Sequence, residues 1–220
     1  MPSSTIEDYL LAIYSLDYEQ VEVIAARLAD KLEVSPPTVS AAVERMVRDG
    51  FVDVDSNHSI SLTKTGFTHA ERLARRHRLI ERWLSDMLHL DWVSLHEEAH
   101  RLEHSLSPLL EQKISEALNH PETCPHGNPI PGNAKNWSFE GMAKLSESKP
   151  GTKMTVARIS ELAEDDADIM LYLQQKNLVP GVNLDIEEIT PFKHVVVNVN
   201  GETAVVDHEI AVFIWVKPTA

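Results

Sequence analysis

The chain has 220 residues, 43% apolar and 25% charged, a composition typical of a globular protein with two or three small domains. No segment approaches the roughly 20 apolar residues that a membrane-spanning helix needs, so we exclude an integral membrane protein. The first residues lack a secretion signal and a single cysteine, Cys124, excludes an internal disulfide, so we expect a cytoplasmic protein.

The first 65 residues are predicted to form a winged helix-turn-helix. Apolar residues recur at helical spacing around Ile6–Tyr14 and again over residues 21–32. Two prolines, Pro36 and Pro37, open a third helix that ends at Gly50. Alternating residues at 51–55 and 60–63 then predict a two-stranded hairpin. This order of elements is typical of a domain that places its third helix in the major groove of DNA.

The charge distribution agrees with DNA binding by this segment. The net charge is −14, but residues 1–80 hold nine basic against twelve acidic residues and are the least acidic part. The residues at the start of the third helix are expected to lie nearest the bases, and they are Ser35, Pro37, Thr38 and Ser40. The candidates for phosphate contacts are Arg27, Lys31, Arg45, Arg48 and Lys64.

The rest of the chain is predicted to hold two further domains, in an α+β fold overall. Residues 66–138 form three helices, at about 65–90, 94–106 and 108–118, followed by a proline-rich loop over 121–132. The first two of these helices are the expected homodimer surface. Residues 139–220 alternate β-type runs with turns and predict a small SH3-like β-barrel with one helix near 166–175.

A cluster of metal-ligand residues lies on the middle helices. Seven of the eleven histidines fall between His58 and His104. In the segment HEEAHRLEH, four ligand-type side chains share one flank of a helix, namely His96, His100, Glu103 and His104. His77 and Glu81 form a second pair one turn apart. Imidazole and carboxylate groups at this spacing can bind one divalent ion.

Two other classes of protein stay open at this point. His96-Glu-Glu-Ala-His100 matches the H-E-x-x-H pattern of zinc hydrolases, in which two histidines bind zinc and the glutamate is a general base. A winged-helix regulator that needs no metal is the second alternative. The Cys124-Pro-His126 pair is given no role, because a lone cysteine is more often packed in a core.

The whole chain resembles the diphtheria toxin repressor family of metal-dependent transcriptional regulators. The similarity rests on the winged helix, His77-Arg-Leu-Ile-Glu81, HEEAHRLEH, Gly127-Asn-Pro-Ile-Pro-Gly132 and the C-terminal β-domain. The resemblance implies a homodimer that binds palindromic operator DNA and controls metal homeostasis, with no enzymatic activity. It also implies two metal sites: a primary site of Asp8, His100, Glu103 and His104, and an ancillary site of His77, Glu81, His96 and Asp166.

The donor types favour manganese at the primary site. Iron-type members of the family carry methionine where Asp8 stands and cysteine where His100 stands. Without sulfur the site offers carboxylate and imidazole donors, which suit Mn(II). Fe(II) is the alternative, in a repressor of iron-uptake genes, and Zn(II) or Co(II) is expected to substitute in vitro because they bind most sites more tightly.

Overall fold

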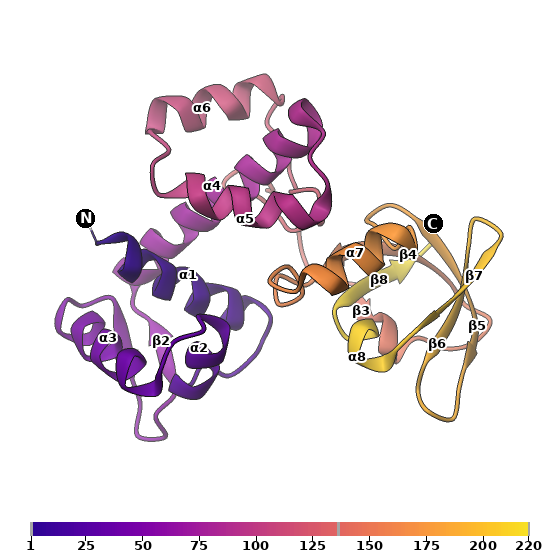
Figure 1. The fold of residues 1–220 in the computed structure, drawn as a ribbon, viewed down its shortest axis with the longest axis horizontal. Coiled ribbons are helices and arrows are strands. Elements are labelled where there is room, and N and C mark those ends of the chain that lie inside the picture. Colours follow the sequence, from indigo (N-terminus) through magenta and orange to yellow (C-terminus); the bar gives the residue numbers. More distant parts are fainter. Residues whose placement is uncertain (1, 136, 220) are drawn as a thin grey trace.

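The computed structural model describes residues 2–135 and 137–219, which form three units around separate cores (Figure 1). The N-terminal unit contains α1 (Ser4–Tyr18), α2 (Ala25–Lys31), α3 (Pro36–Arg48), β1 (Val52–Val54) and β2 (Ile60–Leu62). The middle unit contains α4 (Lys64–Leu88), α5 (Trp92–Glu103) and α6 (Pro108–Ala117). None of the described helices has the length and apolar character required to cross a membrane.

The N-terminal unit has the predicted winged helix-turn-helix architecture. Leu10, Leu28 and Val39, from its three helices, are fully buried in one core. The second helix starts later than expected, at Ala25 instead of residue 21. The reason is that the carbonyl of Val23 accepts a hydrogen bond from the Ile60 N–H at 2.8 Å, so this stretch runs extended beside β2.

Helix α4 connects the N-terminal and middle units. Ala70 and Ala74 on its first half pack in the N-terminal core, whereas Leu79 and Ile80 pack in the middle core. The helix begins where Thr63 accepts a hydrogen bond from the Gly66 N–H. Helices α5 and α6 both contact α4, and Glu111 of α6 binds Arg75 and Arg76 near the middle of that helix. A single rigid helix therefore carries residues of both units.

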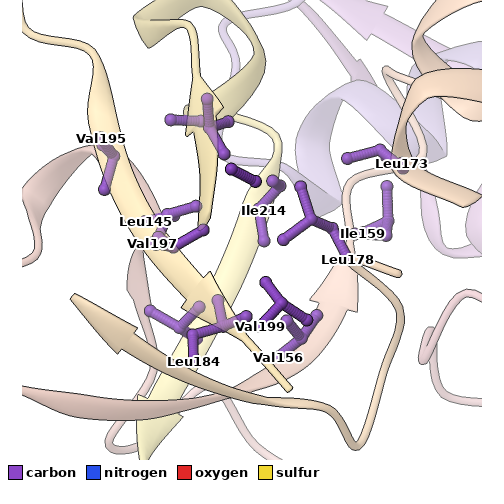
Figure 2. Packing of buried hydrophobic residues seen from close by; sticks show 14 of the residues in the cluster. Leu145, Val156, Ile159, Leu173, Leu178, Leu184, Val195, Val197, Val199 and Ile214 are labelled. Atoms are coloured by element: carbon purple, nitrogen blue, oxygen red, sulfur yellow. The ribbon is translucent and has the colours of Figure 1, made fainter. Parts of the chain in front are cut away.

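The C-terminal unit is a six-stranded antiparallel sheet with the strand order β3-β8-β4-β5-β6-β7. Its aliphatic core lies between the strands and α7, with the contacts shown in Figure 2. The register shifts between Val156 and Arg158 on β4, which is a bulge that bends the strand and redirects its side chains. The elements are β3 (Ala143–Lys144), the 3₁₀ helix η1 (Leu145–Glu147), β4 (Lys153–Ile159), α7 (Ala167–Gln175), β5 (Asn183–Ile189), β6 (Val195–Val199), β7 (Glu202–Val206), α8 (His208–Ala211) and β8 (Ile214–Pro218).

The proline-rich loop packs tightly against the bulge of β4, and Gly127 makes this possible. Gly127 has φ +84°, and a Cβ there would lie 2.4 Å from the Ala157 carbonyl oxygen. We expect Gly127→Ala to lower the free energy of unfolding by about 1–3 kcal/mol more than Gly181→Ala. Gly181 is the matched control because its φ is +90° but a Cβ added to it would meet no other segment within 4 Å. Equal destabilisation of the two variants in urea would contradict this account.

Candidate metal centres

Four of the predicted ligands come together between the N-terminal and middle units, and we call them group A: Asp8, His100, Glu103 and His104. Asp8 lies on α1, and the other three lie on the last turn of α5 and its C-terminal cap. One nitrogen or oxygen atom of each residue lies within 4.8 Å of those of the others. A single small ion fits between donors that are this close together.

The orientation of these donors also fits a cation. His104 Nε2 lies 2.8 Å from Asp8 Oδ1, yet the buried Asp8 oxygen has no aligned hydrogen-bond donor among the described residues. His100 Nδ1 lies 3.0 Å from Glu103 Oε1. The donor atoms are therefore close enough to one another for a single ion to lie among them. Burial raises the pKa of Asp8, although His104 and His100 oppose this shift.

Glu7, which was not among the predicted site residues, orients one of these ligands. Its Oε2 lies 2.8 Å from His104 Nδ1, and His104 Nε2 is directed at Asp8. A carboxylate on the outer nitrogen of a ligating histidine fixes the ring and increases its basicity. The signal available in the sequence was the neighbouring pair Glu7-Asp8, of which only Asp8 was predicted to take part.

We expect Glu7→Ala to weaken Mn(II) binding at group A by about tenfold, because removing such an outer carboxylate costs 10–100-fold in metal affinity. The measurement is a calorimetric Mn(II) titration of the full chain. Asp17→Ala is the control, since it removes the same charge from an exposed position on the same helix. If Asp17→Ala weakened Mn(II) binding by the same factor, the loss in Glu7→Ala would come from the change in net charge and not from the contact with His104.

A second set of ligands lies at the contact of the middle and C-terminal units, and we call it group B: His77, Glu81, His96 and Glu164. His77 Nε2 lies 3.1 Å from Glu81 Oε1 and 3.2 Å from His96 Nδ1. Glu164 Oε2 lies 3.4 Å from His96 Nδ1. The second oxygen of Glu81 is buried without a partner among the described residues. Group B also fits a divalent ion.

The fourth member of group B is Glu164, and the predicted ligand Asp166 lies outside this set. Asp166 precedes α7 and caps it, since its Oδ1 accepts from the N–H groups of Asp168 and Ile169 at 3.0 and 3.1 Å. Between these two acids, Asp165 Oδ1 lies 3.1 Å from His96 Nε2. A capping carboxylate is held at the start of its helix. Glu164, two residues before Asp166, is therefore the acid that joins His77 and His96 in group B.

Cys124 and His126, for which the sequence predicted no role, lie beside group B. With Glu81 they form a further set of fully buried donors within 4.8 Å. His126 Nδ1 is 3.1 Å from Glu164 Oε1 and 3.5 Å from Glu81 Oε1. Neither nitrogen of the ring has an aligned hydrogen-bond partner in the described part of the chain. Glu81 and Glu164 therefore face two sets of donors, and the Cys-x-His spacing in a proline-rich loop was the available signal.

Glu103 connects groups A and B. Its Oε1 belongs to group A, while its Oε2 lies 2.6 Å from His77 Nδ1. Burial opposes ionisation of Glu103, but His77 and His100 hold its pKa at about 2. Burial likewise lowers the pKa of His77, but Glu81 and Glu103 outweigh it and raise this pKa to about 10. A cavity of about 480 Å³ between the three units reaches residues of both groups, including Asp8, His77, His96, His100 and Glu164.

The H-E-x-x-H segment does not form a hydrolase site. His96 belongs to group B and His100 to group A, so the two histidines do not converge on one ion. Glu97 pairs with Arg101 instead of facing either group. The geometry of the described residues gives no support to the metallohydrolase alternative.

The predicted DNA-binding residues lie on the surface of the N-terminal unit. Eight of the nine predicted side chains are exposed, and these are Arg27, Ser35, Pro37, Thr38, Ser40, Arg45, Arg48 and Lys64. Ser35 Oγ and Thr38 Oγ1 are 2.8 Å apart at the start of α3. Lys31 is less exposed than these eight, and its Nζ donates to Asp165 Oδ2 of the C-terminal unit at 2.6 Å.

Comparison with known proteins identifies each unit. The chain matches the N-terminal DNA-binding domain of iron-dependent repressors over residues 1–59. It matches the metal-binding and dimerisation domain of these repressors over residues 63–132 and the FeoA domain over residues 143–218.

Similar proteins cover nearly the full chain. The iron-dependent repressor IdeR of Mycobacterium leprae is 37% identical over 218 residues, 94% of each chain. The diphtheria toxin repressor of Corynebacterium diphtheriae is 35% identical over 90% of each chain. The structure of a manganese-dependent transcriptional repressor complex with manganese has a TM-score of 0.88 at 30% identity, covering 97% of this chain and all of that one. The chain belongs to the iron-dependent repressor family, and it is a metal-dependent transcriptional repressor and not an enzyme.

Proposed function

We propose that the protein represses genes of metal homeostasis by binding a palindromic operator as a homodimer when Mn(II) occupies group A. The observation that carries this proposal is the convergence of Asp8 from the DNA-binding domain with three donors from the dimerisation domain. A bound divalent ion supplies positive charge between carboxylates that otherwise repel each other. The ligands then hold α1 against α5.

This arrangement links metal binding to DNA binding. Half-sites of a palindrome lie one helical turn apart, about 34 Å, so the two α3 helices of a dimer must have a fixed separation. Helix α1, which carries Asp8, packs in the same core as α3, whereas His100 and Glu103 belong to the dimerising unit. A 100-fold metal preference for the DNA-competent arrangement would stabilise it by about 2.7 kcal/mol.

Exposed apolar side chains on the middle unit support dimerisation there. Leu73, Leu84, Leu95 and Leu106, which lie on the helices predicted to form the dimer surface, are buried within the chain itself. The exposed large apolar residues of the middle unit are Phe67, Met87 and Leu88 on α4, Leu102 on α5, and Leu109 and Leu110 on α6. A contiguous patch of exposed apolar side chains marks a protein–protein interface, and these residues are the ones that the proposed dimer would cover.

The donor set supports Mn(II) as the activating metal, with Fe(II) as the alternative. Group A offers only carboxylate and imidazole donors, which suit a hard ion. The relative from Mycobacterium leprae is named an iron-dependent repressor, while a similar solved structure is a manganese-dependent one. The thiol of Cys124 beside group B is the one soft donor near either group in the described structure. Because group A has no soft donor, we expect group A, and not group B, to give the protein its preference for Mn(II).

The function is tested by operator binding as a function of metal. A duplex selected from a random library with the Mn(II)-loaded protein is titrated in anisotropy measurements with Mn(II), Fe(II), Zn(II) or chelator. With each metal at saturation, we expect the operator affinity to rise about 100-fold with Mn(II), to rise less with Fe(II), and to be lowest with chelator, because selectivity depends on coordination geometry more than on metal affinity. Equal affinity with Mn(II) and with chelator would identify a metal-independent regulator, and stronger activation by Fe(II) would overturn the manganese assignment.

A further inference from the structure

A fully buried arginine of the C-terminal domain binds the end of helix α1. Arg158 follows the bulge of β4, and its Nη2 donates to Glu19 Oε2 at 2.6 Å. Neither side chain of this pair is exposed by more than 3%. Glu19 is the C-terminal cap of α1, so the ion pair joins two domains that are more than a hundred residues apart in sequence.

The surroundings of Arg158 fix its position closely. Its guanidinium lies 5.1 Å from the ring centroids of Tyr18, Phe139 and Trp215. Arg158 Nη1 donates to Asn128 Oδ1 in the proline-rich loop. Planar stacking and several directed hydrogen bonds hold an arginine in one geometry, which a lysine would not reproduce.

A second buried contact beside this pair also holds α1. The segment that follows β4 carries Glu161, whose carboxylate accepts from Arg78 Nε at 2.6 Å and from Ser15 Oγ at 2.9 Å. The backbone N–H of Glu161 in turn donates to Glu19 Oε1 at 3.1 Å. The last turn of α1 is thus bound to the C-terminal domain by side chains and backbone together.

Helix α1 therefore has two points of attachment: Glu19, which the C-terminal domain binds, and Asp8, which belongs to group A. Asp8 precedes Glu19 by eleven residues, or about 16 Å along a helix, and group A contains no residue of the C-terminal domain. We propose that Arg158 is a positioning residue for group A, because by binding Glu19 it sets the place of the helix that presents Asp8. This proposal rests on metal binding at group A, and it makes the C-terminal domain a determinant of a site that it does not touch.

The test measures Mn(II) affinity at group A alone, in the full chain. His96→Ala removes a ligand of group B and serves as the parent, and group A is followed in the calorimetric titration as the binding event that Asp8→Ala abolishes in this parent. We expect Arg158→Met in this parent to weaken Mn(II) binding by at least tenfold. Glu19→Gln, which keeps the shape of the side chain and removes its charge, is expected to produce a smaller loss in the same direction and is less disruptive to folding.

Two control variants separate positioning from loss of stability. Lys153→Met removes a charge from the exposed surface of the same strand. Ile214→Val removes a methyl group from the C-terminal core and destabilises that domain without touching α1. Both are expected to leave the Mn(II) affinity of group A within twofold of the parent, at a temperature where every variant is folded by circular dichroism.

The outcomes distinguish this proposal from the proposed function. Unchanged Mn(II) affinity in Arg158→Met and Glu19→Gln overturns the positioning role and leaves group A as a metal site. An equal loss in Ile214→Val also overturns it, because stability alone would then explain the effect. If the His96→Ala parent and the unmodified chain both fail to bind Mn(II), the proposed function fails, and this inference fails with it.

Discussion

Asp8→Ala is expected to abolish metal-stimulated operator binding while leaving the protein folded. Asp8 is the only member of group A that comes from the DNA-binding domain, so the other three ligands alone cannot join the two domains. We expect the roughly 100-fold stimulation by Mn(II) to fall to less than threefold, a loss of about 2 kcal/mol of coupling free energy. The measurement is operator anisotropy with Mn(II) and with chelator.

The Asp8→Ala protein is expected to fold like the unmodified chain. Asp8 is half-buried and is no part of the N-terminal hydrophobic core, so its truncation leaves no cavity among the packed apolar side chains. Asp17→Ala again serves as the control on the same helix. If the Asp8→Ala protein were stimulated by Mn(II) as strongly as the control, an ion at group A would not be what joins the domains.

Leu102→Asp is expected to produce a monomer that binds the operator at least 100-fold more weakly. Leu102 lies on α5 with 40% of its surface exposed, one residue before the buried Glu103 of group A. A carboxylate in an apolar dimer interface would have to lose its hydration without a partner, which disfavours association. A monomer then loses the second half-site contact and with it most of the affinity.

The matched control for this variant is Leu171→Asp on α7, where the leucine is 44% exposed on the C-terminal domain. Light scattering after size-exclusion chromatography gives the mass of each variant, and anisotropy gives its operator affinity. We expect the control to remain a dimer with unchanged affinity. A dimeric Leu102→Asp protein would show that the dimer surface lies away from this face of α5.

The local part of the site could be predicted from the sequence. His100, Glu103 and His104 lie together because residues three and four positions apart share one face of a helix. The same periodicity brings together His77 and Glu81 on α4. Capping and apolar spacing predicted the helices for the same reason, since both depend on nearby residues.

The tertiary part of the site could not be found in this way. Asp166 and Glu164 differ by two positions in an acidic run, and only the capping of α7 decides which of them reaches His96. The position of Cys124 next to Glu81 depends on the path of the proline-rich loop across the β4 bulge. The pair Arg158–Glu19 joins distant segments, and no sequence periodicity relates them.

The central claim is that metal at group A and operator DNA stabilise the same arrangement of domains, and thermodynamic linkage tests it most directly. The Mn(II) affinity of group A is measured in the His96→Ala chain with and without a saturating amount of operator. Linkage requires both ligands to be coupled by one factor, so operator should tighten Mn(II) binding as many fold as Mn(II) tightens operator binding, about 100-fold, and Asp8→Ala should reduce this factor to about one. Identical Mn(II) affinities with and without operator would contradict the account.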